Sequence, residues 1–444
     1  MEKHIENIEF VEVAKLERCG YIKKIDKPIM LSIWCTTYNH ESYVKDALEG
    51  FIHQKVNFEY EIIVFDDAST DETPDIIRSY VQKYPNLIRA YLAHENTYHL
   101  PTRRKLISEF RKVALQGKYI ALCEGDDFWL DANKLQIQVD YMEQTMDCML
   151  TVHSAVKFNC QNYSLQTMAP YDREKDISAE ELIMWYNGNV PTASMVYRRE
   201  MLNISGFFLN TPSADWTIQL YCITKGNVHY FDRIMSCYRA NVKGSYTQCI
   251  WGDITTRLVI RIGHLRFLQN YNKYTKRVHE TYITKKIGRI IQAILCEYKD
   301  MSIEEFDRGC GAAVNACKDE LVNQLKELFR RMKDENYCGN YIMFFLKRYK
   351  HIYIMGAGLW GQKLAKKFIQ NGLEFDGFVV SDEQHHPQEI LEKKVQELSD
   401  IPFCEEIGII VAVQIDLYHQ LIESLCEKNI KSYAYLYNLH AFLE

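Results

Sequence analysis

The chain has 444 residues, of which 47% are hydrophobic and 25% are charged, and its formal net charge is −6. This length accommodates two or three domains, and the acidic balance argues against nucleic acid as a general partner. The 14 cysteines show no Cys-x-x-Cys pair, so we expect a reduced, cytoplasmic protein. The sequence has no apolar run of about 18 residues that would span a membrane, and its polar N-terminus predicts no signal peptide.

The first part of the chain alternates short apolar runs with helical patterns. Residues 1–28 are a mixed, charged extension. Apolar runs then predict buried strands at 30–35, 61–65, 88–93 and 119–123, and apolar residues at helical spacing follow the first three. This βαβα order with short connections predicts a doubly wound, mostly parallel sheet in an α/β fold.

Two acidic clusters follow two of these strands. Asp66-Asp67-Ala68-Ser69-Thr70-Asp71 comes after the second strand, and Glu124-Gly125-Asp126-Asp127 comes after the fourth. Carboxylates this close repel one another, and a divalent cation carrying a diphosphate relieves that repulsion. Because open α/β sheets bind ligands at the carboxyl ends of their strands, we expect one metal and anion site there. The alternatives are a helix-capping turn for the first cluster and a solvated loop for the second.

The pattern is less regular after a predicted helix at 131–145. Strands are predicted at 192–197 and 228–231, and Asp215 opens a helix between them. Residues 251–349 are predicted to be helical, and their first part is rich in Lys and Arg with very few acids. This basic stretch is either an ordinary solvated surface or a face for anionic phospholipid.

A small Rossmann-like domain is predicted at 350–444. The strand at 351–355 leads into Gly356-Ala357-Gly358-Leu359-Trp360-Gly361, which has the G-x-G-x-x-G spacing. A helix and a second strand ending at Asp382 complete one βαβ unit, roughly half a dinucleotide-binding fold. Gly356, Gly358, Gly361 and Asp382 are therefore a candidate second nucleotide site, for NAD or a nucleotide. A regulatory or docking role is the alternative that we favour.

Three segments together resemble family 2 glycosyltransferases of the GT-A fold. They are Ser32-Ile33-Trp34-Cys35-Thr36-Thr37-Tyr38-Asn39, the 66–71 cluster, and the stretch from Gly117 to Asp127, and the resemblance covers roughly residues 29–250. It implies a metal-dependent enzyme that uses Mg²⁺ or Mn²⁺ and moves a hexosyl or N-acetylhexosaminyl group from a nucleotide-diphosphate donor, usually UDP-linked, mostly with inversion. The acceptor would be a hydroxyl of a glycan or lipid-linked glycan, in polysaccharide assembly at the inner face of the membrane.

The same resemblance assigns the nucleotide and metal residues. Thr37, Asn39, Asp67 and Glu124 would bind the nucleotide, with Glu124 standing where the D-x-D motif of the family has Asp. Asp126 would bind the metal, and Asp127 would either share it or lie beside the ligand.

The remaining roles concern the acceptor and the diphosphate. Asp215 would take the proton of the acceptor hydroxyl, the alternative being a helix cap. Trp216 would be either a core residue or an acceptor platform. Arg104 and Arg239 are candidates for diphosphate contact. Two other functions stay open: a nucleotidyltransferase that releases pyrophosphate, and a nucleotide-sugar sensor without turnover.

Overall fold

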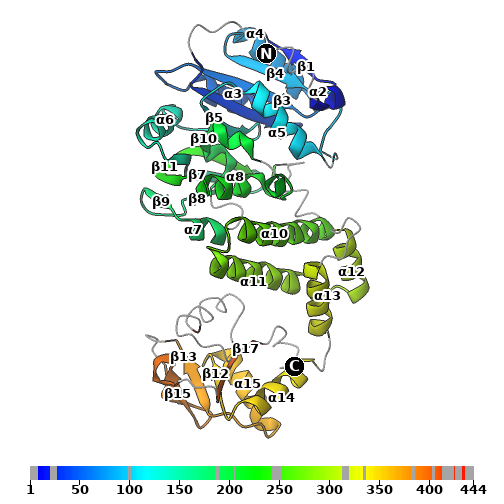
Figure 1. Cartoon of the computed structure of the whole chain (residues 1–444), viewed down its shortest axis with the longest axis vertical. Helices are drawn as coiled ribbons and strands as arrows, with labels where there is room; N and C mark the ends of the chain where they lie inside the picture. Colours follow the sequence, from blue (N-terminus) through cyan, green and yellow to red (C-terminus); the bar gives the residue numbers. More distant parts are fainter. Residues whose placement is uncertain are drawn as a thin grey trace. The chain divides into compact units, whose positions relative to one another are not determined.

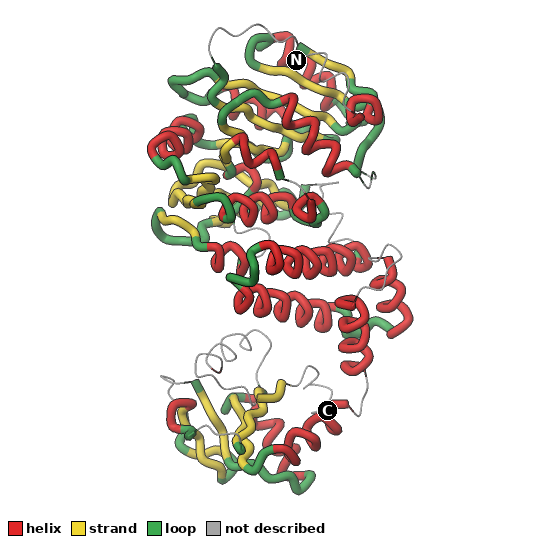
Figure 2. Tube along the Cα trace, viewed as in Figure 1, coloured by secondary structure: helices red, strands yellow, loops and turns green. Residues whose placement is uncertain are grey.

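The computed structural model describes residues 9–20, 28–98, 100, 102–185, 190–204, 206–242, 253–312, 320–333, 337–381, 386–402, 406–412, 425 and 433–435. The chain divides into two compact units, Met1–Ile290 and Ile291–Glu444 (Figures 1 and 2). No helix in the described ranges is long and apolar enough to cross a membrane.

A mixed sheet of eleven described strands forms the centre of the first unit (Figure 1). Its first half is parallel, in the spatial order β4 (Ile88–Leu92), β3 (Tyr60–Asp66), β2 (Leu31–Thr37) and β5 (Tyr119–Glu124). The connecting helices are α3 (Val44–Ile52), α4 (Thr73–Lys83) and α5 (Arg103–Ala114). The predicted doubly wound sheet is therefore confirmed. A short strand, β1 (Glu17–Cys19), pairs antiparallel with β4 beside helix α2 (Glu9–Ala14).

The second half of this sheet is mixed. Strand β10 (Val196–Arg198) runs antiparallel between β5 and β7 (Cys148–Asn159), and β11 (Asn227–Ala240) runs parallel to β7. The short strands β6 (Phe128–Trp129), β8 (Leu165–Met168) and β9 (Lys175–Ile177) pair with β11, β7 and β11.

The strands of this second half differ from the prediction. The predicted strand at 192–197 is a 3₁₀ turn, Thr192–Ser194, followed by β10, and β11 is much longer than the predicted 228–231. Strand β7 was not predicted. Its buried residues include Thr151, His153 and Ser154, which interrupt the apolar run that marks a buried strand.

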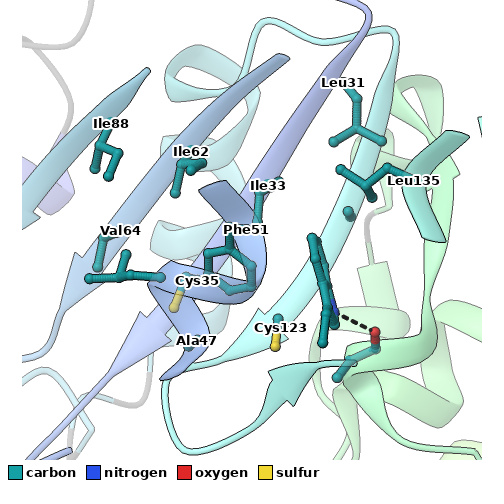
Figure 3. Close-up of a cluster of buried hydrophobic side chains, with 14 of the residues drawn as sticks. Leu31, Ile33, Cys35, Ala47, Phe51, Ile62, Val64, Ile88, Cys123 and Leu135 are labelled. Atoms are coloured by element: carbon teal, nitrogen blue, oxygen red, sulfur yellow. Dashed lines mark hydrogen bonds between the residues drawn. The ribbon is translucent and has the colours of Figure 1, made fainter. Parts of the chain in front are cut away.

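The core under the parallel strands explains why their ends share one edge. Leu31, Ile33 and Cys35 alternate along β2 and face the same side as Ile62 and Val64 of β3, against the apolar face of α3 (Figure 3). Side chains in a strand point to one face at every second residue, so this packing fixes the register of neighbouring strands. Leu31 is paired with Tyr60 and with Tyr119, and the carboxyl ends of β2, β3 and β5 therefore lie together.

Helices cover the rest of the first unit. They are α6 (Lys134–Gln144), α7 (Ala179–Met184), α8 (Ala214–Ile223), α10 (Ile254–Tyr274) and α11 (Glu280–Glu297), whose last residues belong to the second unit. Helix α10 packs on α8, and the Tyr271 hydroxyl donates to the Leu220 carbonyl at 3.2 Å. Because of this packing, α10 is part of the first unit and not a separate linker.

The second unit holds a six-stranded sheet around β12 (His351–Met355) (Figure 1). The spatial order is β14 (Glu389–Ile390), β15 (Lys393–Glu397), β13 (Gly377–Val380), β12, β16 (Ile407–Val411) and β17 (Tyr433–Tyr435), all parallel except β14. The helices are α12 (Ile303–Ala312), α13 (Glu320–Lys333), α14 (Tyr337–Arg348) and α15 (Leu359–Gln370). The sheet is thus larger than one βαβ unit, and its strand order reverses beside β12.

Candidate active site

The two acidic clusters lie at neighbouring strand ends. Asp66 closes β3 and is paired with Thr37 of β2, while Glu124 closes β5 and is paired with Thr36. The Thr37 hydroxyl donates to Asp66 Oδ1 at 2.8 Å. The end of β2 therefore stands between the two clusters, which form one edge of the sheet.

The Glu124–Asp127 turn packs tightly against the end of β2. The Gly125 amide donates to the Thr36 carbonyl at 2.9 Å. A Cβ atom on Gly125 would lie 2.4 Å from Thr37 Cγ2 and 2.9 Å from His40 Nδ1. Any larger residue would push the turn away from the strand, so glycine is required here by close approach.

Asp126 and Asp127 have different surroundings. Asp126 is half-buried, and its Oδ2 lies 3.9 Å from His40 Nε2. Asp127 is buried, and its Oδ1 accepts the Arg239 amide at 2.8 Å. Its other oxygen, Oδ2, is buried and has no hydrogen-bond partner among the described residues. Burial raises the pKa of Asp127 well above its usual range, and the charges of Asp126 and Glu124 add to the effect.

These carboxylates fit a divalent cation. A buried carboxylate oxygen without a partner is costly, and a bound cation would satisfy it. Within the described part of the chain, no three His, Cys, Asp or Glu side chains form a ready-made metal group. Mg²⁺ commonly takes one or two protein carboxylates and fills its shell with substrate phosphates and water. Asp126 and Asp127 are a donor set of that kind.

Arg239 holds the acidic turn in place. Its Nη1 donates to the Asp126 carbonyl at 2.9 Å, and its Nη2 forms an ion pair with Asp46 of α3. The guanidinium also lies 4.4 Å from the centre of the Phe128 ring. The prediction of a diphosphate contact remains untested, but the contacts of this side chain are those of a brace between β11, α3 and the turn.

Asp215 lies within electrostatic range of this cluster. Glu124 is open to solvent at the end of β5. Partial desolvation of its carboxylate raises the pKa of Glu124 to about 8, and the negative charges of Asp126 and Asp215 contribute. Burial also raises the pKa of Asp215, which two backbone amides and the charge of Arg104 partly oppose. The structure thus brings three candidate residues into one region: Asp215 as the base, Glu124 as a nucleotide residue and Arg104 as a diphosphate ligand.

The start of α8 is clamped by two neighbouring elements. Arg104 of α5 donates from Nη2 to the Pro212 carbonyl at 2.7 Å. Ser213, the N-cap residue, is hydrogen-bonded through Oγ to His264 Nε2 of α10 at 2.8 Å. Asp215 sits in the first turn of this helix. The sequence did not indicate His264, because nothing in its spacing links it to the acidic motifs.

Trp216 belongs to the core and not to an acceptor platform. Its side chain is 4% exposed, and its Nε1 donates to the Leu182 carbonyl at 2.8 Å. The ring packs edge-on against His264 and next to Phe267 of α10. A fully packed indole has no face available for stacking on a sugar.

Two of the predicted nucleotide residues, Asn39 and Asp67, are held by hydrogen bonds and an ion pair with neighbouring loops. Asn39 has a left-handed backbone with φ of 55°, and its Oδ1 accepts the Thr70 amide at 2.8 Å. Asp67 is buried, accepts the Thr97 amide at 2.8 Å and pairs with Arg103 at 3.1 Å. The Asn39 contact joins the segments that follow β2 and β3, and the Asp67 contacts join the end of β3 to the segment between β4 and α5. A nucleotide bound by Asp67 would have to share the carboxylate with Thr97 and Arg103.

The glycines of the second unit close a tight strand-to-helix turn. Gly356 has φ of 108°, which favours glycine, and a Cβ on Gly361 would lie 1.6 Å from the Gly356 carbonyl oxygen. Gly358 precedes the first residue of α15, and a Cβ there would meet nothing within 4 Å. Asp382, the fourth residue of the candidate second nucleotide site, lies outside the described residues.

Comparison with known proteins places this edge in a family. Residues 32–204 match the family described as Glycosyl transferase family 2. This part of the chain is a family 2 glycosyltransferase domain. The matched residues include both acidic clusters, whereas Asp215, Arg239 and α10 lie beyond them.

Individual relatives overlap the family 2 domain. An uncharacterized protein of Mycobacterium tuberculosis is 32% identical over 214 residues, 48% of this chain and 60% of that protein. The putative teichuronic acid biosynthesis glycosyltransferase TuaG of Bacillus subtilis is 28% identical over 159 residues, 36% of this chain and 56% of TuaG. The chain thus spans about 60% of the length of the first curated relatives. The structure of S. aureus TarS 1–349 aligns over 73% of this chain and 93% of TarS, with 14% identity and a TM-score of 0.47.

Proposed function

We propose that this protein is a metal-dependent glycosyltransferase. It transfers a sugar from a nucleoside-diphosphate donor, with a UDP-sugar as the first candidate, to a hydroxyl of a glycan or glycoconjugate acceptor, with inversion at the anomeric carbon. The family 2 domain supports the reaction class. The name of TuaG, a relative over part of the chain, supports an acceptor in surface polysaccharide assembly.

One observation carries the proposal. The acidic turn after β5 presents Asp126 and the unpartnered oxygen of Asp127, next to Glu124, whose pKa is raised in part by the charge of Asp215. A donor diphosphate needs charge neutralisation, and an acceptor hydroxyl needs a base. The first need would be met at Asp126 and Asp127, and the second at Asp215.

Each of these residues would have a defined task in the transfer. A divalent cation held by Asp126 and Asp127 would offset the charge that develops on the leaving diphosphate. Asp215 would accept the proton of the acceptor hydroxyl as its oxygen attacks the anomeric carbon. Arg239, the brace of the acidic turn, would keep Asp126 in position.

Purified full-length protein with a panel of nucleotide sugars and Mn²⁺ tests the proposal. Donors that bind should raise the melting temperature of the protein in the presence of Mn²⁺. We expect Asp126→Asn to abolish this metal-dependent shift, and Asp215→Asn to keep it. Transfer by Asp215→Asn should fall by a factor of about 100 to 10,000, the usual contribution of a general base.

The same experiment separates the other functions. Release of pyrophosphate in place of nucleoside diphosphate would identify a nucleotidyltransferase. Donor binding without turnover on any acceptor would identify a nucleotide-sugar sensor. Full transfer activity in Asp215→Asn would remove this residue from the mechanism.

A further inference from the structure

The basic stretch after residue 253 separates into two groups. Between residues 254 and 296 the sequence has one acidic residue, Glu280, and nine basic ones, Arg257, Arg261, Arg266, Lys273, Lys276, Arg277, Lys285, Lys286 and Arg289. Six of these are half-buried or buried and have contacts within the structure, namely Arg257, Arg261, Arg266, Lys285, Lys286 and Arg289. Lys286, for example, donates to the Met184 carbonyl at 3.0 Å. Most of the basic side chains of this stretch therefore make contacts within the protein.

The other three cations lie at the turn between α10 and α11, here called the hairpin tip (residues 273–282). Lys273, Lys276 and Arg277 are exposed there. Large apolar or aromatic side chains are exposed between them: Tyr274 at 43%, Val278 at 76% and Tyr282 at 43%. The hairpin tip thus combines exposed cations with exposed apolar and aromatic side chains. The other cations of these two helices are half-buried or buried.

The positive charge of the hairpin tip is only partly balanced. Glu280 lies 3.6 Å from Arg277, and this pair is solvent-exposed, where an ion pair contributes little. His279 pairs with Glu180 of α7 at 2.7 Å, which ties the tip to the domain. Lys225 is a further exposed cation near the tip. Its Nζ lies 3.4 Å from the Tyr274 hydroxyl.

The backbone of the hairpin tip is left-handed at two consecutive residues. Lys276 and Arg277 have φ of 51° and 62°, in the left-handed region that glycine and asparagine adopt more easily. The Arg277 amide donates to the Asn272 carbonyl at 2.8 Å, which closes the end of α10. Lys276 and Arg277 thus occupy two consecutive positions at which glycine would have less backbone strain.

We propose that the hairpin tip docks on an anionic lipid surface. Lys273, Lys276 and Arg277 would lie against lipid phosphates, Val278 would enter the boundary between headgroups and acyl chains, and Tyr274 and Tyr282 would lie at headgroup level. Cations beside an anionic leaflet, with aromatic rings at the interface, are the general chemistry of such contacts. Val278 favours a lipid surface over a soluble polyanion. Its isopropyl group gains free energy by leaving water for an acyl region, and a fully hydrated polymer offers no such region. The inference does not depend on the proposed function.

Co-sedimentation of the full-length protein with vesicles tests this assignment. The vesicles contain phosphatidylcholine alone or phosphatidylcholine mixed with phosphatidylglycerol. We expect binding to the mixed vesicles only, and weaker binding at higher salt. The double substitution Lys276→Gln with Arg277→Gln should lower the partition coefficient by a factor of about 25, since each cation contributes about fivefold. Val278→Ser should also weaken binding, at unchanged charge.

A charge-matched control distinguishes the tip from net charge. Lys55→Gln with Lys83→Gln removes two exposed cations far from the tip in sequence, and it should leave binding nearly unchanged. Equal losses in the two double variants would overturn the proposal, as would equal binding to the neutral vesicles. If Val278→Ser has no effect and soluble polyphosphate competes fully with the vesicles, the tip is a polyanion site and the lipid assignment is wrong. Thermal unfolding of each variant shows whether a loss comes from misfolding.

Discussion

At the scale of single residues, the candidate base is defined by its surroundings more than by its position in the sequence. Asp215 lies in the first turn of a helix, where a carboxylate is also a common cap. Burial raises its pKa, so it holds a proton more strongly than an exposed Asp, and the Arg104 cation opposes this. A base must be unprotonated before it can act. The rate should therefore fall as the pH drops through the raised pKa of Asp215.

Arg104 offers a direct test of that balance. Arg104→Gln removes a cation that lowers the pKa of Asp215, so the pKa should rise further. We expect the acid limb of the kcat/KM profile for transfer to move to higher pH by roughly half a unit. Arg104→Lys keeps the charge and should leave the limb nearly in place. If both variants instead raise the KM of the donor without moving the limb, Arg104 acts on the diphosphate, as the sequence suggested.

At the scale of elements, α10 is a structural part of the candidate site. It lies beyond the residues matched by the family, yet it contacts the segment before Asp215 at two consecutive positions. His264 is hydrogen-bonded to Ser213, and a Cβ on Gly263 would lie 2.5 Å from Pro212 Cγ. The placement of α8, and with it Asp215, therefore depends on a helix outside the catalytic motifs.

Gly263→Ala should disturb the site through this contact. The added methyl group must push Pro212 and the start of α8 away, at a cost of about 1–3 kcal/mol in stability. We expect kcat for transfer to fall, while the melting-temperature shift with donor and Mn²⁺ persists. Gly288→Ala is the matched control, because its Cβ would meet nothing within 4 Å on α11, where alanine favours the helix. A kcat for Gly263→Ala equal to that of the control would show that α10 does not position Asp215.

The elements also show what the sequence could and could not predict. The parallel strands and the acidic turn were predictable, because apolar runs followed by carboxylates are local patterns. Arg239 was noticed, but its contacts with Asp46 and Asp127 join residues far apart in the chain. Strand β7 was missed because buried polar side chains such as Thr151 interrupt its apolar run, and Thr151 Oγ1 accepts from Gln138 of another element, α6, at 3.0 Å. Such tertiary pairing leaves no periodic signal.

At the scale of the whole molecule, the second unit has the strand order of a nucleotide-binding fold. The chain passes from β12 to β13 and β15 on one side, and then to β16 and β17 on the other. Open α/β sheets bind ligands at such a reversal, outside the carboxyl ends of the strands. The glycine turn after β12 lies at this edge. This reversal in strand order supports the hypothesis of a nucleotide site more strongly than one βαβ unit alone would. Binding of NAD remains a prediction.

Two glycine variants separate folding of the second unit from ligand binding. Gly361→Ala places a methyl group against the Gly356 carbonyl, so we expect the second unit to lose about 3 kcal/mol or more. Differential scanning calorimetry of the full chain should then show a lower transition for that unit, with the donor-dependent transition of the first unit unchanged. Gly358→Ala has open space and an ordinary φ of −78°, and it should fold normally. If phosphates approach the backbone at Gly358, this second variant should lose the melting-temperature shift that NAD or a nucleotide sugar gives the second unit in the native protein. A native second unit that shows no such shift with any nucleotide would leave docking or regulation as its role.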